Sequence, residues 1–348
     1  MNRETRATNR PQQPERIGSA MPPAPPSQPP LWRRLQRAGP GLGAAWHPVR
    51  GGGSLSDPPP EPTAFGEVEI VEGAGDFRLC DVGDPGDSGF RYFLDGIEQT
   101  RICGYLGTVP LVHGYVAAVV REREERVFTT WDVIEREILV FPHRLLDPRP
   151  FVELGMPEDA LIDSEAEPAD AHPLRLAEKG REAVKLQRAI CERTLARRWA
   201  ENAPSEAYIL LDGGLAIDPA LLKSGRAIGL IKSHRTQFLS PGAMSEVLSM
   251  SRGCRSPVFK PVRPEVGEVY SWYLRLRPAQ NHDIYWSLAR IEARAATETV
   301  ERADELSRWL LAETAPLALP DFRWDVLLYP IRDCEQFLRA RMPTLDVW

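Results

Sequence analysis

Two aspartates follow apolar segments of the chain, and each is itself followed by glycine. Asp95 stands in the sequence FLDG and Asp212 in the sequence LLDGG. An aspartate at the tip of a buried strand, with a glycine that lets a ligand approach the backbone, directs a carboxylate into a crevice. The same sequences also suit an Asx-type turn, in which the aspartate caps a chain reversal. The residues alone leave both interpretations open.

A third carboxylate, Glu192, belongs to a helix predicted for residues 176–202, a segment rich in Ala, Leu, Glu, Lys and Arg that contains no proline. If Leu195 and Trp199 mark the buried stripe of this helix, Glu192 lies on the stripe or at its edge. A carboxylate there needs a partner. The pattern offers a metal ion, or an ion pair with Arg188 four residues earlier on the same face.

Three carboxylates from two strands and a helix suit Mg²⁺ or Mn²⁺, because these hard cations take oxygen ligands. Two such ions about 4 Å apart activate water and stabilise the leaving oxygen of a phosphodiester. The predicted reaction is therefore phosphodiester hydrolysis. Other chemistries lack their residues: the chain has no H-E-x-x-H zinc motif, no Asp-x-Asp at either aspartate for a haloacid-dehalogenase reaction, and no P-loop for a motor.

The elements that must position these groups indicate a mixed α/β domain. Runs of apolar and β-branched residues predict strands at 90–94, 109–121, 207–211, 227–231, 269–276 and 285–293. Two further helices are predicted for about 297–314 and 332–341. Residues 122–175 are charged and rich in proline, and we expect an insertion or irregular connections there.

The order of these elements resembles that of the NurA-type nucleases over roughly residues 88–340. In that family's pattern a strand ends in Asp-Gly, a helix carries an inward Glu, a strand ends in Leu-Asp-Gly-x-Leu, and another strand runs into a lysine. Asp95, Glu192, Asp212 and Lys232 hold these positions here. Further similarity lies in YLRL at 273–276, ARIE at 289–292 and the pair Tyr329-Pro330.

The resemblance implies an RNase H-like fold, with a mixed sheet flanked by helices. It also implies cleavage of DNA that depends on Mn²⁺ or Mg²⁺, with Asp95, Glu192 and Asp212 as ligands. The implied assembly is a homodimer with two-fold symmetry that works with a hexameric HerA-type ATPase in the cytoplasm.

The chain departs from the family's pattern in the last helix. The family carries Ala-His there, about eight residues after the tyrosine, where this chain has Gln336 and Phe337. Glu335 is slightly favoured as the substitute for the missing catalytic group. Asp333 is the other choice, although an acid at that position also complements the dipole at the start of a helix.

Basic residues are concentrated in one segment of an acidic protein. The formal net charge is −6, and residues 223–277 hold ten Lys or Arg against three Glu. Such a segment predicts a stripe that follows the phosphates of a nucleic acid, on which Phe238, Phe259 and Trp272 would stack bases unless they belong to the core. Lys232, as a compact point charge, would neutralise the scissile phosphate. The predicted DNA contacts are Lys232, Arg235, Arg252, Arg255, Lys260 and Arg263.

Residues 1–63 differ from the nuclease-like domain predicted for 64–348. They contain runs of proline and glycine that bury too little apolar surface to offset the entropy of ordering, so a disordered arm is expected. Residues 31–37 interrupt it with Leu31, Trp32 and Leu35 on one helical face, either as a short helix that docks on a partner or as part of the flexible arm. No apolar segment of membrane-spanning or signal-peptide type is present, and a protein that stays inside the cell is expected.

A function from another class also fits the sequence. With the last catalytic position changed, the chain would be a non-catalytic or weakly catalytic subunit that clamps DNA or stabilises a ring-shaped ATPase. Release of nucleotides from a labelled strand in Mn²⁺ separates this alternative from a nuclease.

Overall fold

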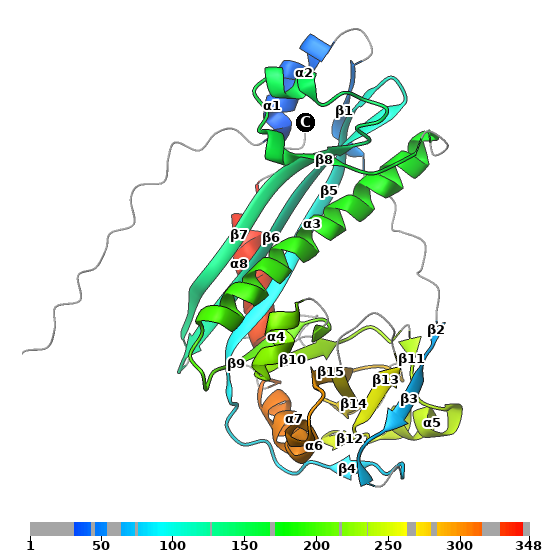
Figure 1. Ribbon diagram of the computed structural model, residues 1–348, viewed down its shortest axis with the longest axis vertical. Helices are drawn as coiled ribbons and strands as arrows, with labels where there is room; N and C mark the ends of the chain where they lie inside the picture. The colour runs from blue at the N-terminus through cyan, green and yellow to red at the C-terminus, as the bar shows by residue number, and fades with distance from the viewer. Residues whose placement is uncertain are drawn as a thin grey trace, which may run out of the picture.

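The computed structural model places a long mixed sheet at the centre of the protein (Figure 1). Hydrogen bonds between neighbours give the strand order β3-β13-β14-β15-β10-β9-β5-β6-β7-β8. The structure describes residues 31–42, 46–53, 64–73, 76–125, 127–167, 171–215, 218–234, 236–262, 269–279, 284–314 and 328–343.

Five strands form the part of the sheet that carries the candidate site. The strands β5 (Phe90–Leu106), β6 (Val109–Glu124) and β7 (Val127–Phe141) pair antiparallel in sequence order. On the other side of β5, β9 (Tyr208–Asp212) and β10 (Ala227–Ile231) run parallel to it. Three antiparallel strands followed by a helix and two strands parallel to the first are the RNase H-like arrangement, so the expected fold is confirmed.

The connection to β9 is made by α3 (Pro173–Asn202), the helix that the sequence predicts. Its first turn begins with a proline and is capped by His172, whose Nδ1 accepts a hydrogen bond from the backbone N–H of Leu174 (3.2 Å). Ala203 and Pro204 follow its last turn, because proline cannot continue a helix. The helix therefore has start and stop signals in the sequence itself.

Residues 127–141 form β7, although the sequence predicts irregular connections over 122–175. Most of this strand is only partly buried, and it carries charged residues at Asp132 and at 135–137. Only its last three residues pair with the short β8 (Leu161–Asp163) on the far side. A half-exposed outer strand carries many polar side chains, which is why its composition resembles that of a loop.

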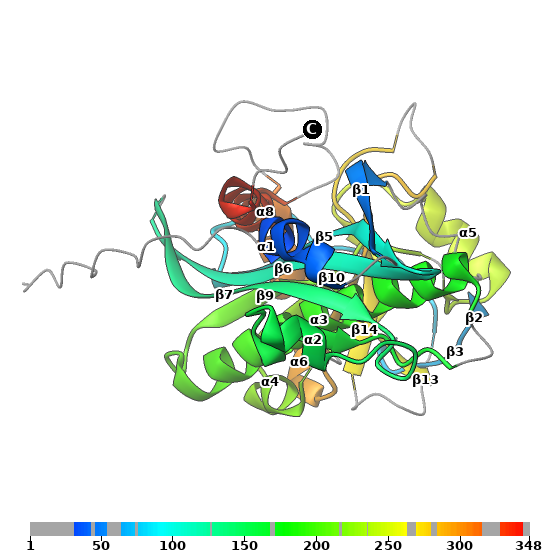
Figure 2. The ribbon, with the colours of Figure 1, turned by 90° about the horizontal axis from the view of Figure 1, so that it is seen from above.

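Helices cover both faces of the sheet (Figure 2). One face packs against α3, in a core that includes Leu94 of β5 and Leu195 and Trp199 of α3. The other packs against α7 (Ala303–Ala312) and α8 (Tyr329–Arg341) and contains Phe93 and Cys334. Burial on both faces holds β5 and β9 rigidly, so groups at their ends are fixed in position.

The remaining strands extend the sheet beyond β10 and form a smaller core around α5 (Pro241–Ser249). The expected hairpin is present, because β14 (Val269–Arg275) and β15 (Leu288–Arg294) pair antiparallel. The short elements are η1 (Gly39–Leu42), β1 (Trp46–Gly53), β2 (Ala64–Phe65), β3 (Glu67–Ile70), β4 (Cys80–Asp81), α2 (Arg149–Glu153), η3 (Glu158–Ala160), α4 (Pro219–Ser224), β11 (Thr236–Gln237), β12 (Cys254–Arg255), β13 (Phe259–Val262) and α6 (Thr297–Glu301).

Part of the predicted N-terminal arm is folded onto the domain. Residues Leu31–Ala38 form α1, in which Leu31, Trp32 and Leu35 are buried. Leu31 and Leu35 belong to a cluster that includes Leu111 and Phe141 of the central strands. The apolar face of α1 is thus occupied by this chain, which corrects its interpretation as a face free to dock on a partner. Residues 1–30 lie outside the described part of the chain.

Candidate active site

The two aspartates lie side by side where β9 ends. Leu94 pairs with Leu211 between the parallel strands β5 and β9, so the next residues, Asp95 and Asp212, are neighbours. Past this point β9 stops but β5 continues to Leu106. Among the described residues, no strand pairs with this edge of β5 until β1 joins it near Ile102. The strand ends thus leave an open edge beside the carboxylates.

Glu192 reaches this edge from α3 on the other face of the sheet. Successive residues of β5 point to opposite faces of the sheet. Asp95 and Ile97 lie on the face covered by α8, and Gly96 lies on the face covered by α3. A Cβ atom at Gly96 would overlap the Glu192 carboxylate. The glycine of the Asp-Gly sequence is therefore required for a close approach, and it lets a helix carboxylate contact the backbone between the two faces.

Lys232 comes from the strand next to β9. It follows β10 directly, and its Nζ lies 2.7 Å from Oδ2 of Asp212. About a quarter of each of the two side chains is exposed, so the pair faces a solvent-accessible place. The structure thus brings together Asp95, Glu192, Asp212 and Lys232, four of the five residues to which the sequence assigns a catalytic role.

Burial and mutual repulsion perturb two of the carboxyl groups. Burial raises the pKa of Asp95 well above its usual value, and the neighbouring Asp212 carboxylate raises it further. Burial also raises the pKa of Glu192 to about 7, against the opposing effect of Arg188 and with a contribution from Asp212. Clustered buried carboxylates that resist ionisation are stabilised by a cation, which is the environment that a metal ion prefers.

The oxygen donors suit Mg²⁺ or Mn²⁺, but the side chains are turned toward protein cations. As they stand, no three His, Cys, Asp or Glu side chains within the described ranges converge closely enough to hold one ion. Lys232 binds Asp212, and Arg188 binds Glu192 with its Nη1 2.9 Å from Oε1. The Arg188 pair is the alternative that the sequence leaves open for Glu192. A metal ion at this site would have to compete with both pairs.

Glu335, the fifth predicted catalytic residue, does not join the cluster. Its carboxylate accepts hydrogen bonds from Arg332 (2.7 Å) and Arg339 (2.8 Å) on the same helix. Partial burial acts to raise its pKa, but these arginines hold it below the usual value. Asp333 is likewise paired, with Arg121 of β6 (2.7 Å). The turn of α8 that meets β5 instead presents Cys334, whose Sγ lies 3.5 Å from the Phe93 carbonyl oxygen.

Two acids near the site have no part in the sequence prediction. Glu98 lies two residues beyond Gly96 on the same face of β5, and Nε of Arg188 lies 3.1 Å from its Oε2. Strand alternation from Gly96 is the signal that would have found it. Glu292 of β15 is almost fully buried, and its Oε2 accepts a hydrogen bond from Leu215 N (3.0 Å) in the loop after Asp212. Glu292 therefore positions that loop.

The predicted DNA-binding segment is not one surface. Arg255 is 2% exposed and binds Glu72 and Asp304, and this buried role corrects its assignment to DNA. Phe238, Phe259 and Trp272 are core residues, which is the second of the two interpretations that the sequence leaves open for them. The local sequence could not reveal this, because burial depends on the partner strands. Lys260 lies on β13, paired with β3, while Arg235 and Arg263 lie outside the described residues.

Arg252 and Arg255 provide a test of this correction. Arg255→Ala leaves two carboxylates without their buried partner, and we expect it to lower the free energy of unfolding by about 1–3 kcal/mol. Arg252→Ala removes an exposed side chain, so its unfolding free energy should stay within about 0.5 kcal/mol of wild type. Urea denaturation measures both. Equal stability of the two variants would contradict the structural role of Arg255.

Glu192→Gln tests the electrostatics of the cluster. Because the folded-state pKa of Glu192 is raised, the folded protein binds a proton that the unfolded chain releases at lower pH. This contribution to stability is present at low pH and is lost as the pH rises from about 4.5 to about 7. In EDTA, we expect the stability of Glu192→Gln relative to wild type to increase across that window. A constant difference measured by thermal or urea unfolding would contradict the raised pKa.

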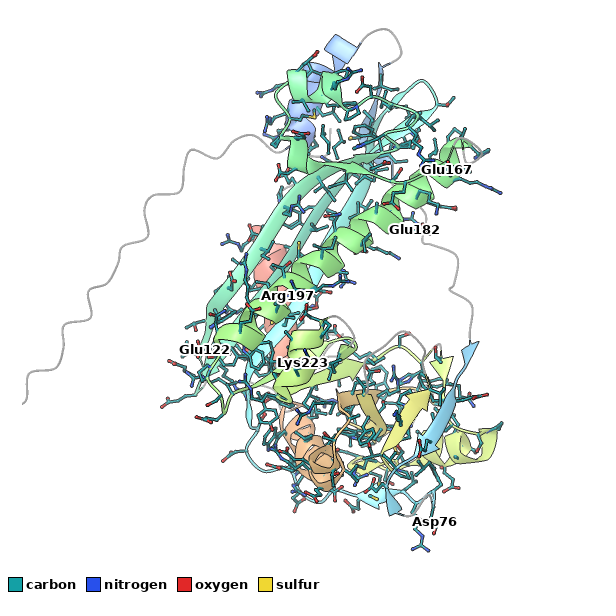
Figure 3. All side chains as sticks on the ribbon, in the orientation of Figure 1. Asp76, Glu122, Glu167, Glu182, Arg197 and Lys223 are labelled. Atoms are coloured by element: carbon teal, nitrogen blue, oxygen red, sulfur yellow. The ribbon has the colours of Figure 1, made fainter. Side chains whose placement is uncertain are left out.

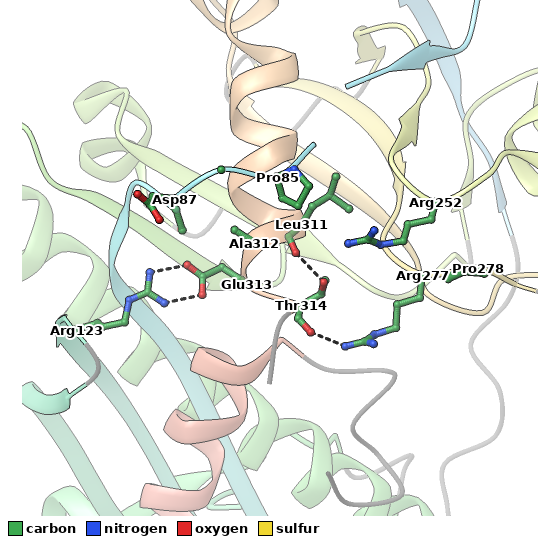
Figure 4. Close-up of a pocket in the computed structure, with 12 residues that line it drawn as sticks. Pro85, Asp87, Arg123, Arg252, Arg277, Pro278, Leu311, Ala312, Glu313 and Thr314 are labelled. Atoms are coloured by element: carbon green, nitrogen blue, oxygen red, sulfur yellow. Dashed lines mark hydrogen bonds and ion pairs between the residues drawn. The ribbon is translucent and has the colours of Figure 1, made fainter. Parts of the chain in front are cut away.

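A cavity of about 570 Å³ lies away from the carboxylates, near the start of β5 (Figure 4). Its wall includes Arg123, whose guanidinium binds both oxygens of Glu313 at 2.6 Å. Arg277 donates a hydrogen bond to the Thr314 carbonyl oxygen (2.6 Å). These arginines hold the end of α7 against the sheet, and none of the five predicted catalytic residues lines the cavity.

The outer side of α3 is joined to α4 near the site. Arg197 and Lys223 lie in this region (Figure 3). Arg197 Nη2 lies 2.8 Å from Oδ2 of Asp218, which also caps α4 by accepting a hydrogen bond from Ala220 N. This contact joins α3 to the segment that follows β9.

Comparisons with known proteins find similarity at the level of solved structures. No family model matches the chain, and no curated protein matches its sequence. The chain is similar to the NurA nuclease from Sulfolobus solfataricus, with a TM-score of 0.45 and 12% identity over 78% of this chain and 84% of that one. It is also similar to the catalytic domain of human endonuclease V, with a TM-score of 0.31 and 12% identity over 89% of this chain and 94% of the other.

No helix in the part of the chain that the structure describes has the length and apolarity needed to cross a membrane. The strands of the central sheet follow an RNase H-like order, and Asp95 and Asp212 are neighbours where β9 ends. Together they describe an α/β domain of RNase H-like topology with an acidic site at its open sheet edge.

Proposed function

We propose that the protein is a metal-dependent nuclease that hydrolyses phosphodiester bonds of DNA. The observation that carries the proposal is the meeting of Asp95, Glu192 and Asp212, from two strands and a helix, beside Lys232 at an open sheet edge. Burial and the Asp212 carboxylate raise the pKa of Asp95 and of Glu192, and three carboxylates offer the oxygen donors that suit Mn²⁺ or Mg²⁺.

The roles of the residues follow from their positions. Asp95, Glu192 and Asp212 would hold the ion, which when bound activates water and stabilises charge on the phosphate oxygens. Lys232, which pairs with Asp212 here, would be released if that carboxylate held an ion, and its ammonium would then neutralise the scissile phosphate. Glu292 keeps the loop after Asp212 in place through its hydrogen bond from Leu215. Gly96 keeps space open for Glu192.

The test is hydrolysis of end-labelled single-stranded and double-stranded DNA by the purified full chain. We expect products in Mn²⁺ or Mg²⁺ and none in EDTA, with activity restored when metal is added back. A preparation that binds DNA but releases no nucleotide in saturating Mn²⁺ would overturn the nuclease assignment.

A HerA-type hexameric ATPase is the partner that we propose for this nuclease, supported by the sequence resemblance. The chain has no P-loop of its own, so processive movement along DNA would come from such a ring. A homodimer with two-fold symmetry is proposed on the same basis. Size-exclusion chromatography with and without a HerA-type ATPase tests both. A monomer that forms no complex would contradict them.

A weakly catalytic DNA-clamping subunit is the second candidate, and one observation favours it. The turn of α8 that meets β5 supplies Cys334 and no carboxylate or imidazole to the site, since Asp333 and Glu335 are held by arginines. A site with three acids from β5, α3 and β9 would cleave slowly if it needs a proton-transfer group from this helix. Single-turnover cleavage rates in Mn²⁺ distinguish the two candidates.

A further inference from the structure

Arg188 is the protein's own cation on the α3 side of the acidic site. Its guanidinium bridges two carboxylates, with Nη1 2.9 Å from Glu192 and Nε 3.1 Å from Glu98. About a third of the side chain is exposed, so the group can reach solvent without unfolding α3. Lys232 has the corresponding position beside Asp212. Two of the three acids of the site, Glu192 and Asp212, are therefore each paired with a basic side chain.

We propose that Arg188 is an exchangeable cation that leaves Glu192 when a divalent ion binds and then holds a phosphate of the DNA. This inference rests on the proposed nuclease function and adds a substrate-binding residue to the same site. Glu98 acts as the second holding point, which keeps the guanidinium at the site while it is not bound to Glu192.

The charges around Arg188 support an exchange. Burial acts to lower the pKa of Arg188, but the nearby carboxylates Glu192, Glu98, Asp95 and Asp212 outweigh it and raise the pKa. The group is thus a full positive charge that balances several acids. A divalent ion on Glu192 would repel it and would satisfy the carboxylate that it leaves.

The chemistry of the side chain identifies the ligand as a phosphodiester. A guanidinium presents its N–H groups in a planar fork that fits two oxygens of a phosphate as well as it fits a carboxylate. Among the described residues no strand pairs with this edge of β5 between Asp95 and Ile102, and about a third of the Arg188 side chain is exposed. The same guanidinium can therefore pass from Glu192 to the backbone of a bound strand.

Arg198 on the same helix supplies a matched control. It binds Asp132 of β7, with Nη1 3.0 Å from Oδ2, and half of its side chain is exposed. Arg198→Gln therefore removes one positive charge from α3, as Arg188→Gln does, but it breaks one ion pair where Arg188→Gln breaks two, and its partner is not one of the carboxylates of the site. Any difference between the two variants reports the position of Arg188.

The experiment measures two equilibria on the full chain. Isothermal titration with Mn²⁺ in the absence of DNA should show about two- to fivefold tighter binding by Arg188→Gln than by wild type, because Glu192 has lost its competing partner. With Ca²⁺ in place of Mn²⁺, Arg188→Gln should bind a labelled oligonucleotide more weakly than wild type does. The slope of log affinity against log salt should fall by about one. Arg188→Lys should restore that slope.

Each outcome decides a separate point. If wild type binds no Mn²⁺, the proposed function fails and the inference fails with it. If wild type binds Mn²⁺ but Arg188→Gln matches it in both measurements, the inference is overturned and the proposed function stands. Weaker Mn²⁺ binding by Arg188→Gln, equal shifts in Arg198→Gln, or an unchanged salt slope would each also overturn the exchange.

Discussion

Asp212→Asn is expected to reduce the rate of DNA cleavage by at least about a hundredfold, because several kcal/mol of transition-state stabilisation depend on a metal ligand. The same loss is expected for Asp95→Asn. Both variants should remain folded, since removing one of several neighbouring carboxylates relieves repulsion. Initial rates in saturating Mn²⁺, with a thermal melt of each variant, check the two parts of the prediction.

Glu335→Gln is the control for these two variants. Glu335 is also a partly buried carboxylate with a perturbed pKa, but its partners are Arg332 and Arg339 on its own helix. We expect this variant to cleave at nearly the wild-type rate. A loss as large as that of Asp212→Asn would show that α8 contributes to the site after all, and a wild-type rate for Asp212→Asn would remove the metal-site assignment.

Glu292→Ala should have the largest effect on stability. Its carboxylate and Arg290 form a buried pair, with Nη1 2.6 Å from Oε1, and both residues are at most 5% exposed. Truncation leaves a buried guanidinium without its charge partner and removes the acceptor of Leu215 N. Breaking a buried pair in this way costs about 3–5 kcal/mol. Urea unfolding provides the measurement.

Two variants control this prediction. Glu292→Gln keeps an acceptor for Leu215 N but removes the charge, so its stability should lie between those of Glu292→Ala and wild type. Glu298→Ala removes an exposed acid that is 3.6 Å from Arg302, and such a surface pair contributes less than about 1 kcal/mol. A loss for Glu292→Ala no larger than that for Glu298→Ala would contradict the buried role.

The sequence by itself determined β9 with its end at Asp212, β10 and most of α3, but it ended β5 at Asp95, whereas that strand runs on to Leu106, and it missed β7. Apolar runs specify β9 and β10, because a strand covered on both faces must be apolar along its whole length. The composition of residues 176–202 predicts α3, which begins three residues earlier, at Pro173. The two Asp-Gly sequences place carboxylates at one edge once the strands run parallel, and this made Asp95 and Asp212 predictable.

Only the tertiary structure decided which charges meet. Arg188 contacts Glu98, and Glu292 contacts the loop after Asp212. Each of these two contacts joins residues that are far apart in the sequence. Arg255 looks like any basic residue of its segment until the pairing of β12 with β14 and β4 buries it. The physical reason is that hydrophobic periodicity fixes which residues face inward within one element. The register between strands and the rotation of α3 and α8 on the sheet fix which polar groups are neighbours, and no local pattern encodes them.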